Sequence, residues 1–429
     1  MTYQETLDYL FNKLPMFSHL GADAFKKDLT NTIKLCEALG NPHHQFKSIH
    51  IAGTNGKGST SHLLAAILQT AGYKTGLYTS PHLKDFRERI KIDGAFCSEE
   101  FVVDFTNKIK PLIEEIEPSF FEITVAMAFT YFAQQKVDIA VIEVGLGGRL
   151  DSTNIITPEL CIITNIGWDH TNLLGNTLPL IAYEKAGIIK KGIPVVIGET
   201  LPETKSVFEE KANSLKAPIT FAQQKRYVSD FSIYLHKMEV EIVELETDIH
   251  EKYQLDLNGI YQTHNLLTVL EAVNQINHLG YTISQSVVKD ALKQIKRLTG
   301  LHGRWQVIQT NPTIVLDVAH NEDGIKQLLS QLEHCTYSHL HIVIGMVKDK
   351  DIDKALQILP KHANYYFTNA QIPRALSADK LKEIGKNNSL HGNCYIKVVE
   401  ALNAAKNKAI PEDLILVCGS VFVVGEVEY

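Results

Sequence analysis

The chain has 429 residues, of which 45% are hydrophobic, so it predicts two or three domains with full-sized cores. Its net charge of -7 excludes the global positive field that nucleic-acid binding requires. No apolar run is long enough to span a membrane, and residues 1–15 lack a signal-peptide core, so we expect no membrane partner.

The six cysteines are scattered along the sequence, with no C-x-x-C and no paired spacing. This pattern favours reduced thiols in a cytosolic enzyme over a disulfide framework or a zinc site. We therefore expect a cytoplasmic location.

Helical spacing dominates the start of the chain, where helices are expected near residues 7–14 and 29–39. From residue 49 onwards, short apolar strands alternate with helices. Residues 137–144 are nearly all apolar and mostly β-branched, which is typical of a strand buried on both faces of a parallel sheet. The alternation predicts a doubly wound α/β domain.

The pattern changes at residues 227–257, where alternating hydrophobic residues predict a meander of strands. Two further helices are expected, at residues 263–279 and 284–298. Two glycines then interrupt the chain, and a fresh alternation of strands and helices begins. Its later strands include one expected at residues 394–399.

These changes divide the chain into a first domain over residues 1–298, a linker over residues 299–306 and a smaller α/β domain over residues 307–429.

The segment from Ile49 to Ser61, IHIAGTNGKGSTS, predicts a phosphate-binding loop. An apolar strand runs into three glycines, and a helical pattern follows. Glycines let backbone amides approach an anion, the helix N-terminus adds a partial positive charge, and a lysine reaches the outer phosphates. The residues expected to bind the triphosphate are Gly53, Thr54, Asn55, Gly56, Lys57, Gly58, Ser59 and Thr60.

The match to the common P-loop is imperfect, because Ile51 takes the place of the first glycine and Gly58 that of the final Ser or Thr. The alternative is a glycine-rich turn with a solvated lysine. The register of strand, glycines, lysine and helix favours a nucleoside triphosphate site.

Two further candidates follow buried strands of the first domain. Glu143 ends the strand at residues 137–144, and Asp169-His170 follows another apolar strand. Ligands of open α/β sheets bind beyond the carboxyl ends of the strands, where Glu143 would hold magnesium and His170 would contact metal or phosphate. The alternatives are a loop-capping carboxylate and a structural histidine. Lys185 has the pattern of a solvated helix lysine.

The second domain contributes Asp317-Val318-Ala319-His320-Asn321 after a strand, and the linker contributes Arg304. An arginine and a histidine from this side would neutralise a triphosphate only when the domains close. The alternative is hydrogen bonding across the domain interface.

The chain contains, in order, GTNGKGST from Gly53, TSPHL from Thr79, ERI from Glu88, EVGLGGRLDSTN from Glu143, EKAG from Glu184, GRW from Gly303 and DVAHN from Asp317. Together these motifs resemble the folylpolyglutamate synthase and dihydrofolate synthase family, within the muramyl-ligase superfamily of ATP-dependent amide ligases. The resemblance implies a P-loop ATPase domain with a parallel-rich sheet, a linker, and a smaller Rossmann-like C-terminal domain.

The resemblance also implies residue roles. Catalytic roles fall to Lys57, Lys185, Arg304 and His320. Asn265, Arg304, Asp317 and His320 would join the loop residues in binding ATP. Ser80, Glu143 and His170 would ligate Mg²⁺, at one or two sites. Lys185 matches a lysine that is carbamylated in similar enzymes.

The implied reaction joins L-glutamate to the carboxylate of a folate or of dihydropteroate. ATP converts that carboxylate into an acyl phosphate, and the amine of glutamate then displaces phosphate. No side-chain nucleophile is needed, and none stands out in the sequence. Activity as a dihydrofolate synthase, as a folylpolyglutamate synthase, or as both stays open, and we expect a monomer.

One alternative is a peptidoglycan-precursor ligase, and the other is a non-catalytic nucleotide-binding module. Only 52 residues precede Gly53, which is too few for the extra domain that a peptidoglycan-precursor ligase carries there. The expected catalytic residues are all present, which argues against a non-catalytic module. Among possible substrate contacts, His82 and Arg89 are candidates for residues near the glutamate pocket. The pterin candidates are Phe120, Phe121 and residues 46–50.

Overall fold

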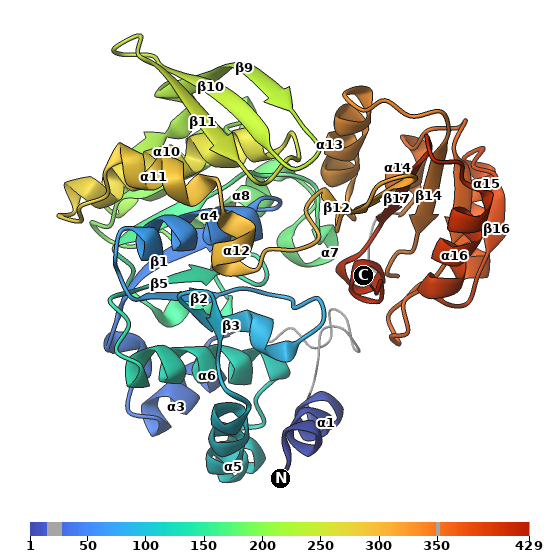
Figure 1. Cartoon of the computed structure of the whole chain (residues 1–429). Coiled ribbons are helices and arrows are strands. Elements are labelled where there is room, and N and C mark those ends of the chain that lie inside the picture. Colours follow the sequence, from blue (N-terminus) through green and yellow to red (C-terminus); the bar gives the residue numbers. More distant parts are fainter. Residues whose placement is uncertain (15–27, 349–351, 429) are drawn as a thin grey trace.

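The computed structural model describes residues 1–14, 28–348 and 352–428 and shows two α/β units side by side (Figure 1). The larger unit contains an eight-stranded and a three-stranded sheet, and the smaller unit a six-stranded sheet. The C-terminus lies near the boundary between the units (Figure 1). None of the described helices is long and apolar enough to cross a membrane, and the six cysteines form no disulfide.

The strands of the large sheet are β1 (Lys47–Ala52), β2 (Thr75–Tyr78), β3 (Ile90–Ile92), β4 (Ala95–Phe96), β5 (Ile139–Glu143), β6 (Leu160–Ile163), β7 (Val195–Ile197) and β8 (Ile219–Phe221). Their order is β4-β3-β2-β5-β1-β6-β7-β8. All pairs from β2 to β8 are parallel, whereas β3 and β4 pair antiparallel at one edge. Every residue of β5 and β6 is buried, which confirms the parallel sheet predicted from their apolar runs.

Helices cover both faces of this sheet. They are α1 (Tyr3–Lys13), α3 (Thr30–Ala38), α4 (Lys57–Thr70), α5 (Glu99–Ile116), α6 (Phe120–Gln134), α7 (Thr171–Leu174), α8 (Leu178–Ala186), α9 (Pro202–Ser214), α10 (Gln262–His278), α11 (Gln285–Leu292) and α12 (Ile295–Thr299). Helix α4 is buried against the sheet on one side and against α10, α11 and α12 on the other. The predicted meander is present as β9 (Arg226–Ile233), β10 (Met238–Glu244) and β11 (His250–Leu255).

The single helix predicted at residues 284–298 is wrong, because the chain breaks into α11 and α12. The N–H of Asp256 donates to the carbonyl of Leu292 at 3.2 Å, and the Asp256 carboxylate accepts the N–H of Lys296 at 2.9 Å. A residue distant in sequence therefore ends one helix and begins the next.

The smaller unit follows the same plan. Its strands are β12 (Gln306–Gln309), β13 (Thr313–Leu316), β14 (Leu340–Ile344), β15 (Asn364–Phe367), β16 (Gly392–Cys394) and β17 (Leu414–Cys418). Its helices are α13 (Glu322–Glu333), α14 (Ile352–Gln357), α15 (Ala378–Asn387), α16 (Val398–Lys408) and α17 (Val421–Gly425). The order is β12-β13-β17-β14-β15-β16, and only β12 is antiparallel to its neighbour.

The strand predicted at residues 394–399 is also wrong, because β16 ends at Cys394 and α16 begins at Val398. Val398, Ala401, Leu402 and Ala405 are buried at helical spacing. A short apolar run does not distinguish a strand from the first turn of a helix.

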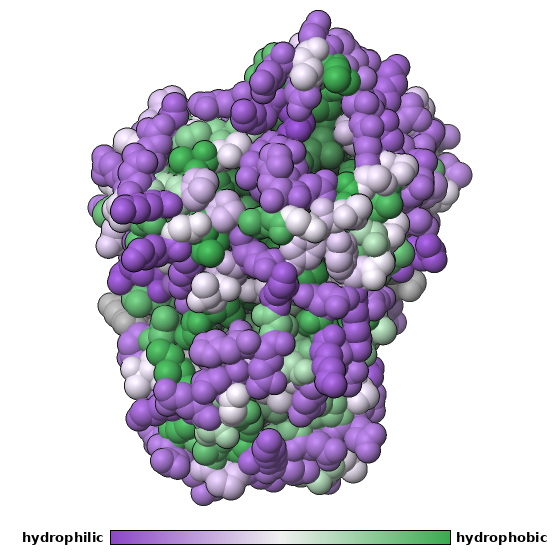
Figure 2. All heavy atoms as spheres, turned by 90° about the vertical axis from the view of Figure 1, so that its left-hand side faces the viewer, coloured by the Kyte–Doolittle hydropathy of each residue, from purple (hydrophilic) through white to green (hydrophobic). Residues whose placement is uncertain are grey.

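Hydrophilic side chains cover most of the face shown in Figure 2, and hydrophobic side chains appear between them in several separate places. Single exposed hydrophobic residues of this kind are normal on a folded domain. A large cavity lies instead between the two units.

Candidate active site

A cavity of about 1040 Å³ lies between the two units, at the carboxyl ends of β1, β2, β5 and β6. Every residue singled out for catalysis, nucleotide binding or metal binding lines it, except Thr60. The N–H of Thr60 donates to the carbonyl of Gly56 at 2.8 Å, and its side chain is fully buried. Residues distant in sequence therefore converge where an open α/β sheet binds its ligands.

The phosphate-binding loop connects β1 to α4, which begins at Lys57. Two of its glycines have positive φ angles, 150° at Gly53 and 82° at Gly56. A β-carbon at Gly53 would meet the hydroxyl of Thr164, and one at Gly56 would meet the amide oxygen of Asn265. Both positions therefore require glycine for close backbone packing.

Two lysines converge on this loop. The Lys57 ammonium donates to the carbonyls of Gly53 and Thr54 at 3.0 and 3.2 Å, and the Lys185 ammonium donates to the same Gly53 carbonyl at 2.9 Å. Lys185 is only 4% exposed, so the solvated helix lysine suggested by its local sequence is wrong. Two positive charges thus lie beside the expected phosphate position.

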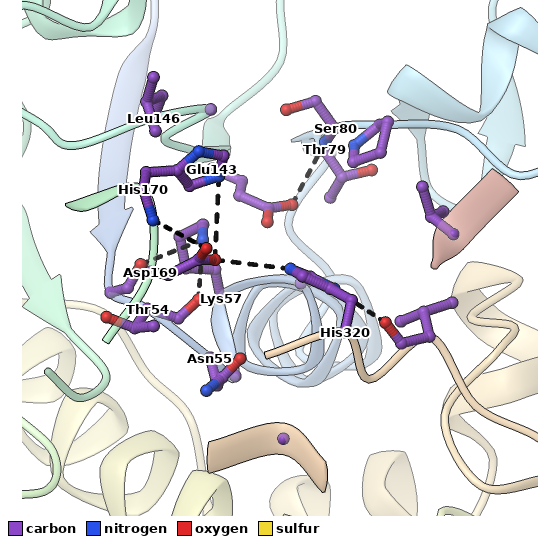
Figure 3. A pocket seen from close by; sticks show the side chains of 18 of the residues that line it. Thr54, Asn55, Lys57, Thr79, Ser80, Glu143, Leu146, Asp169, His170 and His320 are labelled. Atoms are coloured by element: carbon purple, nitrogen blue, oxygen red, sulfur yellow. Dashed lines mark hydrogen bonds and ion pairs between the residues drawn. The ribbon is translucent and has the colours of Figure 1, made fainter. Parts of the chain in front are cut away.

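Glu143 lies at the end of β5, with 4% of its surface exposed. Its Oε2 accepts the N–H of Ser80 at 3.3 Å (Figure 3). Burial raises the pKa of Glu143 to about 7, although Lys57 and Arg304 oppose that rise. This carboxyl would gain most from a bound cation.

No three His, Cys, Asp or Glu side chains in the described chain are grouped as a metal site. Mg²⁺ usually takes one or two carboxylates and completes its shell with water and phosphate oxygens. The Glu143 carboxylate and the Ser80 hydroxyl are hard donors at this cavity, with His170 on its wall. The donor set therefore fits a magnesium ion that is bound together with a triphosphate.

The two units meet at Asp169, which lies between His170 and His320 in Figure 3. Its Oδ2 is 3.8 Å from His170 Nε2, 3.5 Å from His320 Nε2 and 3.4 Å from the Asn321 side-chain amide. The amides of Asn55 and Asn321 also exchange hydrogen bonds at 3.3 and 3.2 Å. His320 therefore takes part in interdomain bonding, as the alternative interpretation expected.

Asp317 connects the units from a buried position. Its Oδ2 accepts the Tyr261 hydroxyl at 2.6 Å and the Trp305 N–H at 2.7 Å, and its Oδ1 accepts the Ala319 N–H at 2.9 Å. Burial raises the pKa of Asp317. Both oxygens therefore already hold the local backbone and the start of α10 in place.

The start of α10 also touches the phosphate-binding loop. The Asn265 side chain donates to Gln262 Oε1 at 2.9 Å, and the Gln262 amide donates to Ser59 Oγ at 3.1 Å. From the sequence, Asp169 and Asn321 were named only as neighbours of His170 and His320 and were given no role of their own. Gln262 was missed, because nothing local distinguishes it from an ordinary helix residue.

An aromatic wall of the cavity is made of Phe11, His82, Phe120 and Phe121. The Phe11 ring lies 5.5 Å from that of Phe120 and 6.3 Å from that of His82. The Arg89 side chain donates to His82 Nδ1 at 2.9 Å. Residues 46–50 are not among the residues that line the cavity, whereas Phe11 of α1 lines it.

Two family models match the chain. The Mur ligase middle domain matches residues 51–273, and the glutamate ligase domain of Mur ligases matches residues 303–421.

Curated relatives match along almost the whole chain. A dihydrofolate synthase/folylpolyglutamate synthase of Bacillus subtilis is 32% identical, covering 99% of this chain and 98% of the relative. A folylpolyglutamate synthase of Lacticaseibacillus casei is 31% identical and covers 100% of this chain and 98% of its own.

Solved structures match equally well. The Mycobacterium tuberculosis folylpolyglutamate synthase complexed with ADP and AMPPCP superposes with a TM-score of 0.86 at 29% identity, over 99% of this chain and 97% of the other. The Escherichia coli FolC in complex with DHPP and ADP gives a TM-score of 0.82 at 29% identity, over 99% and 96%.

Proposed function

This chain belongs to the dihydrofolate synthase and folylpolyglutamate synthase family of Mur ligases, and from that premise we propose that it is an ATP-dependent ligase that joins L-glutamate to a folate-type carboxylate. The observation that supports this most directly is the convergence of Lys57 and Lys185 on the Gly53 carbonyl, beside the buried Glu143. Neither a peptidoglycan-precursor ligase nor a non-catalytic module is favoured by the relatives.

The cavity residues suit the chemistry of the first step. A carboxylate of the acceptor attacks the γ-phosphorus of ATP, and ADP leaves with the bond electrons, which gives an acyl phosphate. Lys57 would leave the loop carbonyls to pair with the phosphate oxygens, and Arg304 and His320 would offset charge from the second unit. Magnesium, held by Ser80, Glu143 and His170, would supply further neutralisation of the phosphates.

In the second step the α-amine of glutamate attacks the acyl carbon, loses a proton, and expels inorganic phosphate. The groups that held the γ-phosphate would then stabilise the leaving phosphate. Asn265 is the proposed adenine contact. Asp317 is the proposed ribose contact, provided that the Tyr261 hydroxyl shares that carboxylate.

The acceptor would lie against the aromatic wall, whose rings suit a flat pterin. We further propose that Lys185 is carbamylated, because a buried lysine beside a metal site would become an additional anionic ligand. The protein is proposed to act as a monomer, since one chain supplies all the cavity residues, and light scattering on the purified protein tests this.

The experiment that tests the function measures phosphate release with ATP, Mg²⁺ and glutamate, with dihydropteroate in one series and tetrahydrofolate in the other. Release with both acceptors is expected for a bifunctional enzyme, and release with one assigns the branch. Release with neither acceptor, but with another carboxylate, would preserve the ligase chemistry and overturn the folate assignment.

A further inference from the structure

A second group of basic side chains lines the cavity near the linker. His62 comes from α4, Lys91 from β3, and His302 from the segment before Arg304. His62 stands four residues after Gly58, so both face the same side of α4, one helical turn apart. A β-carbon at Gly58 would lie 3.2 Å from Arg304 Nη2 and 3.7 Å from Glu143 Oε2.

The inner two members of this group are buried although they are basic. His62 is 5% exposed and Lys91 only 2%. His62 Nδ1 has no hydrogen-bond partner in the described structure, and the Lys91 ammonium donates to the Thr299 carbonyl at 2.7 Å. A buried polar atom without a partner is costly, and such atoms in a cavity point to a missing ligand.

The charges around this position are predominantly positive. Burial, with Lys91, Arg304 and His302 nearby, lowers the pKa of His62 well below its usual range. Burial also lowers the pKa of Lys91 to about 8. Glu88 is the nearest counter-charge, but its carboxylate already accepts the N–H groups of residues 83–85. These groups therefore favour a bound anion.

The spacing along α4 fits one class of anion. One helical turn, about 5.4 Å, separates the level of Arg304 and Glu143 from that of His62. This span resembles the length of a glutamate side chain. A glutamyl unit whose amine or carboxylate reacts near Gly58 would therefore have its second carboxylate beside His62.

We propose that His62, Lys91 and His302 form a carboxylate subsite that binds the non-reacting carboxylate of a glutamyl unit. This inference rests on the proposed glutamate-ligase function. The unit could come from the incoming glutamate or from the terminal glutamate of a folate acceptor, and the chemistry of recognition is the same. His302, at the exposed mouth, would meet the carboxylate first, and the two buried groups would hold it.

The test compares Lys91→Met, which keeps the aliphatic stem, with His62→Gln and His302→Gln. Lys386→Met, an exposed lysine on α15, is the matched control. We expect the KM for the glutamyl substrate to rise on the order of tenfold to a hundredfold in Lys91→Met and His62→Gln, since a charge-assisted bond is lost. The KM for ATP should stay within about twofold. The exposed His302 variant guards against misfolding of the buried ones.

The two acceptors distinguish the sources of the carboxylate. An effect on the KM for glutamate with both acceptors assigns the subsite to the incoming amino acid. An effect on the KM for tetrahydrofolate alone assigns it to the acceptor, because dihydropteroate has no glutamate. Unchanged KM values for all three substrates in every variant would overturn the proposal.

Calorimetry separates this inference from the proposed function. Carboxylate binding should draw protons onto His62 and Lys91, so the binding enthalpy of glutamate or tetrahydrofolate should vary with the ionisation enthalpy of the buffer. This proton uptake should disappear in the His62 and Lys91 variants. If the wild type ligates neither acceptor, the proposed function fails. Binding of glutamate with proton uptake would still support the subsite in that case. Absence of this proton uptake would overturn the subsite.

Discussion

At the scale of single residues, Glu143 is a buried group through which the metal-free protein should respond to pH. Its pKa is about 7 in the folded protein against an ordinary value of 4.5. At this site the folded protein therefore holds more protons between these values, so the contribution of Glu143 to the free energy of unfolding should fall as pH rises from about 4.5 to 7. Glu143→Gln should remove this loss and stabilise the protein at pH 8 by up to roughly 3 kcal/mol.

The same variant should lose ligase activity by at least about a hundredfold, because it cannot supply a carboxylate to the metal. Thermal unfolding from pH 4 to pH 8, in the presence of a chelator, measures the stability effect. An equally steep pH dependence in the wild type and in the variant would show that Glu143 does not titrate in this window.

Lys185 allows a test of carbamylation. Its ammonium is buried against the Gly53 carbonyl, so a carbamate there would add negative charge that only a nearby cation could stabilise. We expect activity to fall after carbon dioxide is stripped at mildly acidic pH and to return with bicarbonate. Lys185→Met should lose at least about a hundredfold in kcat and should not respond to bicarbonate. A fully active, unmodified lysine by intact mass would contradict the proposal.

At the scale of secondary-structure elements, the junction of β1 and α4 depends on Gly56. Gly56→Ala imposes a positive φ on alanine and pushes its β-carbon into the Asn265 side chain. Gly72→Ala, at the other end of α4, imposes a φ of 94° but meets no atom within 4 Å, so it is the matched control. The positive φ alone should cost about 1 kcal/mol of stability in either variant, and Gly56→Ala should cost more because its β-carbon meets Asn265.

Only Gly56→Ala should weaken the binding of ATP, because only this variant displaces the loop and the proposed adenine contact. Its KM for ATP should rise about tenfold or more. Steady-state kinetics and thermal unfolding of both variants measure this difference. Equal KM values for ATP in the two variants would argue against Asn265 as a nucleotide contact.

At the scale of the whole molecule, several polar contacts beside the cavity help to hold the two units together. Asn55 pairs with Asn321, and Asp169 lies beside both His320 and Asn321. Asn321→Ala should remove roughly 1–3 kcal/mol of interdomain bonding, which would shift the substrate-free protein toward open arrangements. Small-angle scattering should show a larger radius of gyration than for the exposed control Asn393→Ala, and ATP with Mg²⁺ should reduce the difference.

The sequence predicted the parts of this protein that local signals determine. The glycines of the loop, Lys57 and the buried strand that ends in Glu143 are all recognisable within a short window, and the order of the motifs correctly identified the family. The failures were non-local. Asp256 breaks a helix from about forty residues away, and the buried side of Val398 depends on its packing partners.

The site divides in the same way. The positions of Glu143 and His170 beyond their strands followed from sheet topology. The burial of Lys185, the role of Asp169 between the units and the contribution of Phe11 from α1 depend on tertiary packing, which no spacing in the sequence encodes.

The continuity of the cavity has a pharmacological consequence. In the described part of the chain, the phosphate-binding loop, the aromatic wall and the linker side all border the same cavity. A single bisubstrate inhibitor, in which a nucleotide is tethered to a pterin-bearing carboxylate mimic, could therefore engage both halves at once. Its second half would bind at the high effective concentration set by a short tether, so its potency should exceed that of either fragment by orders of magnitude.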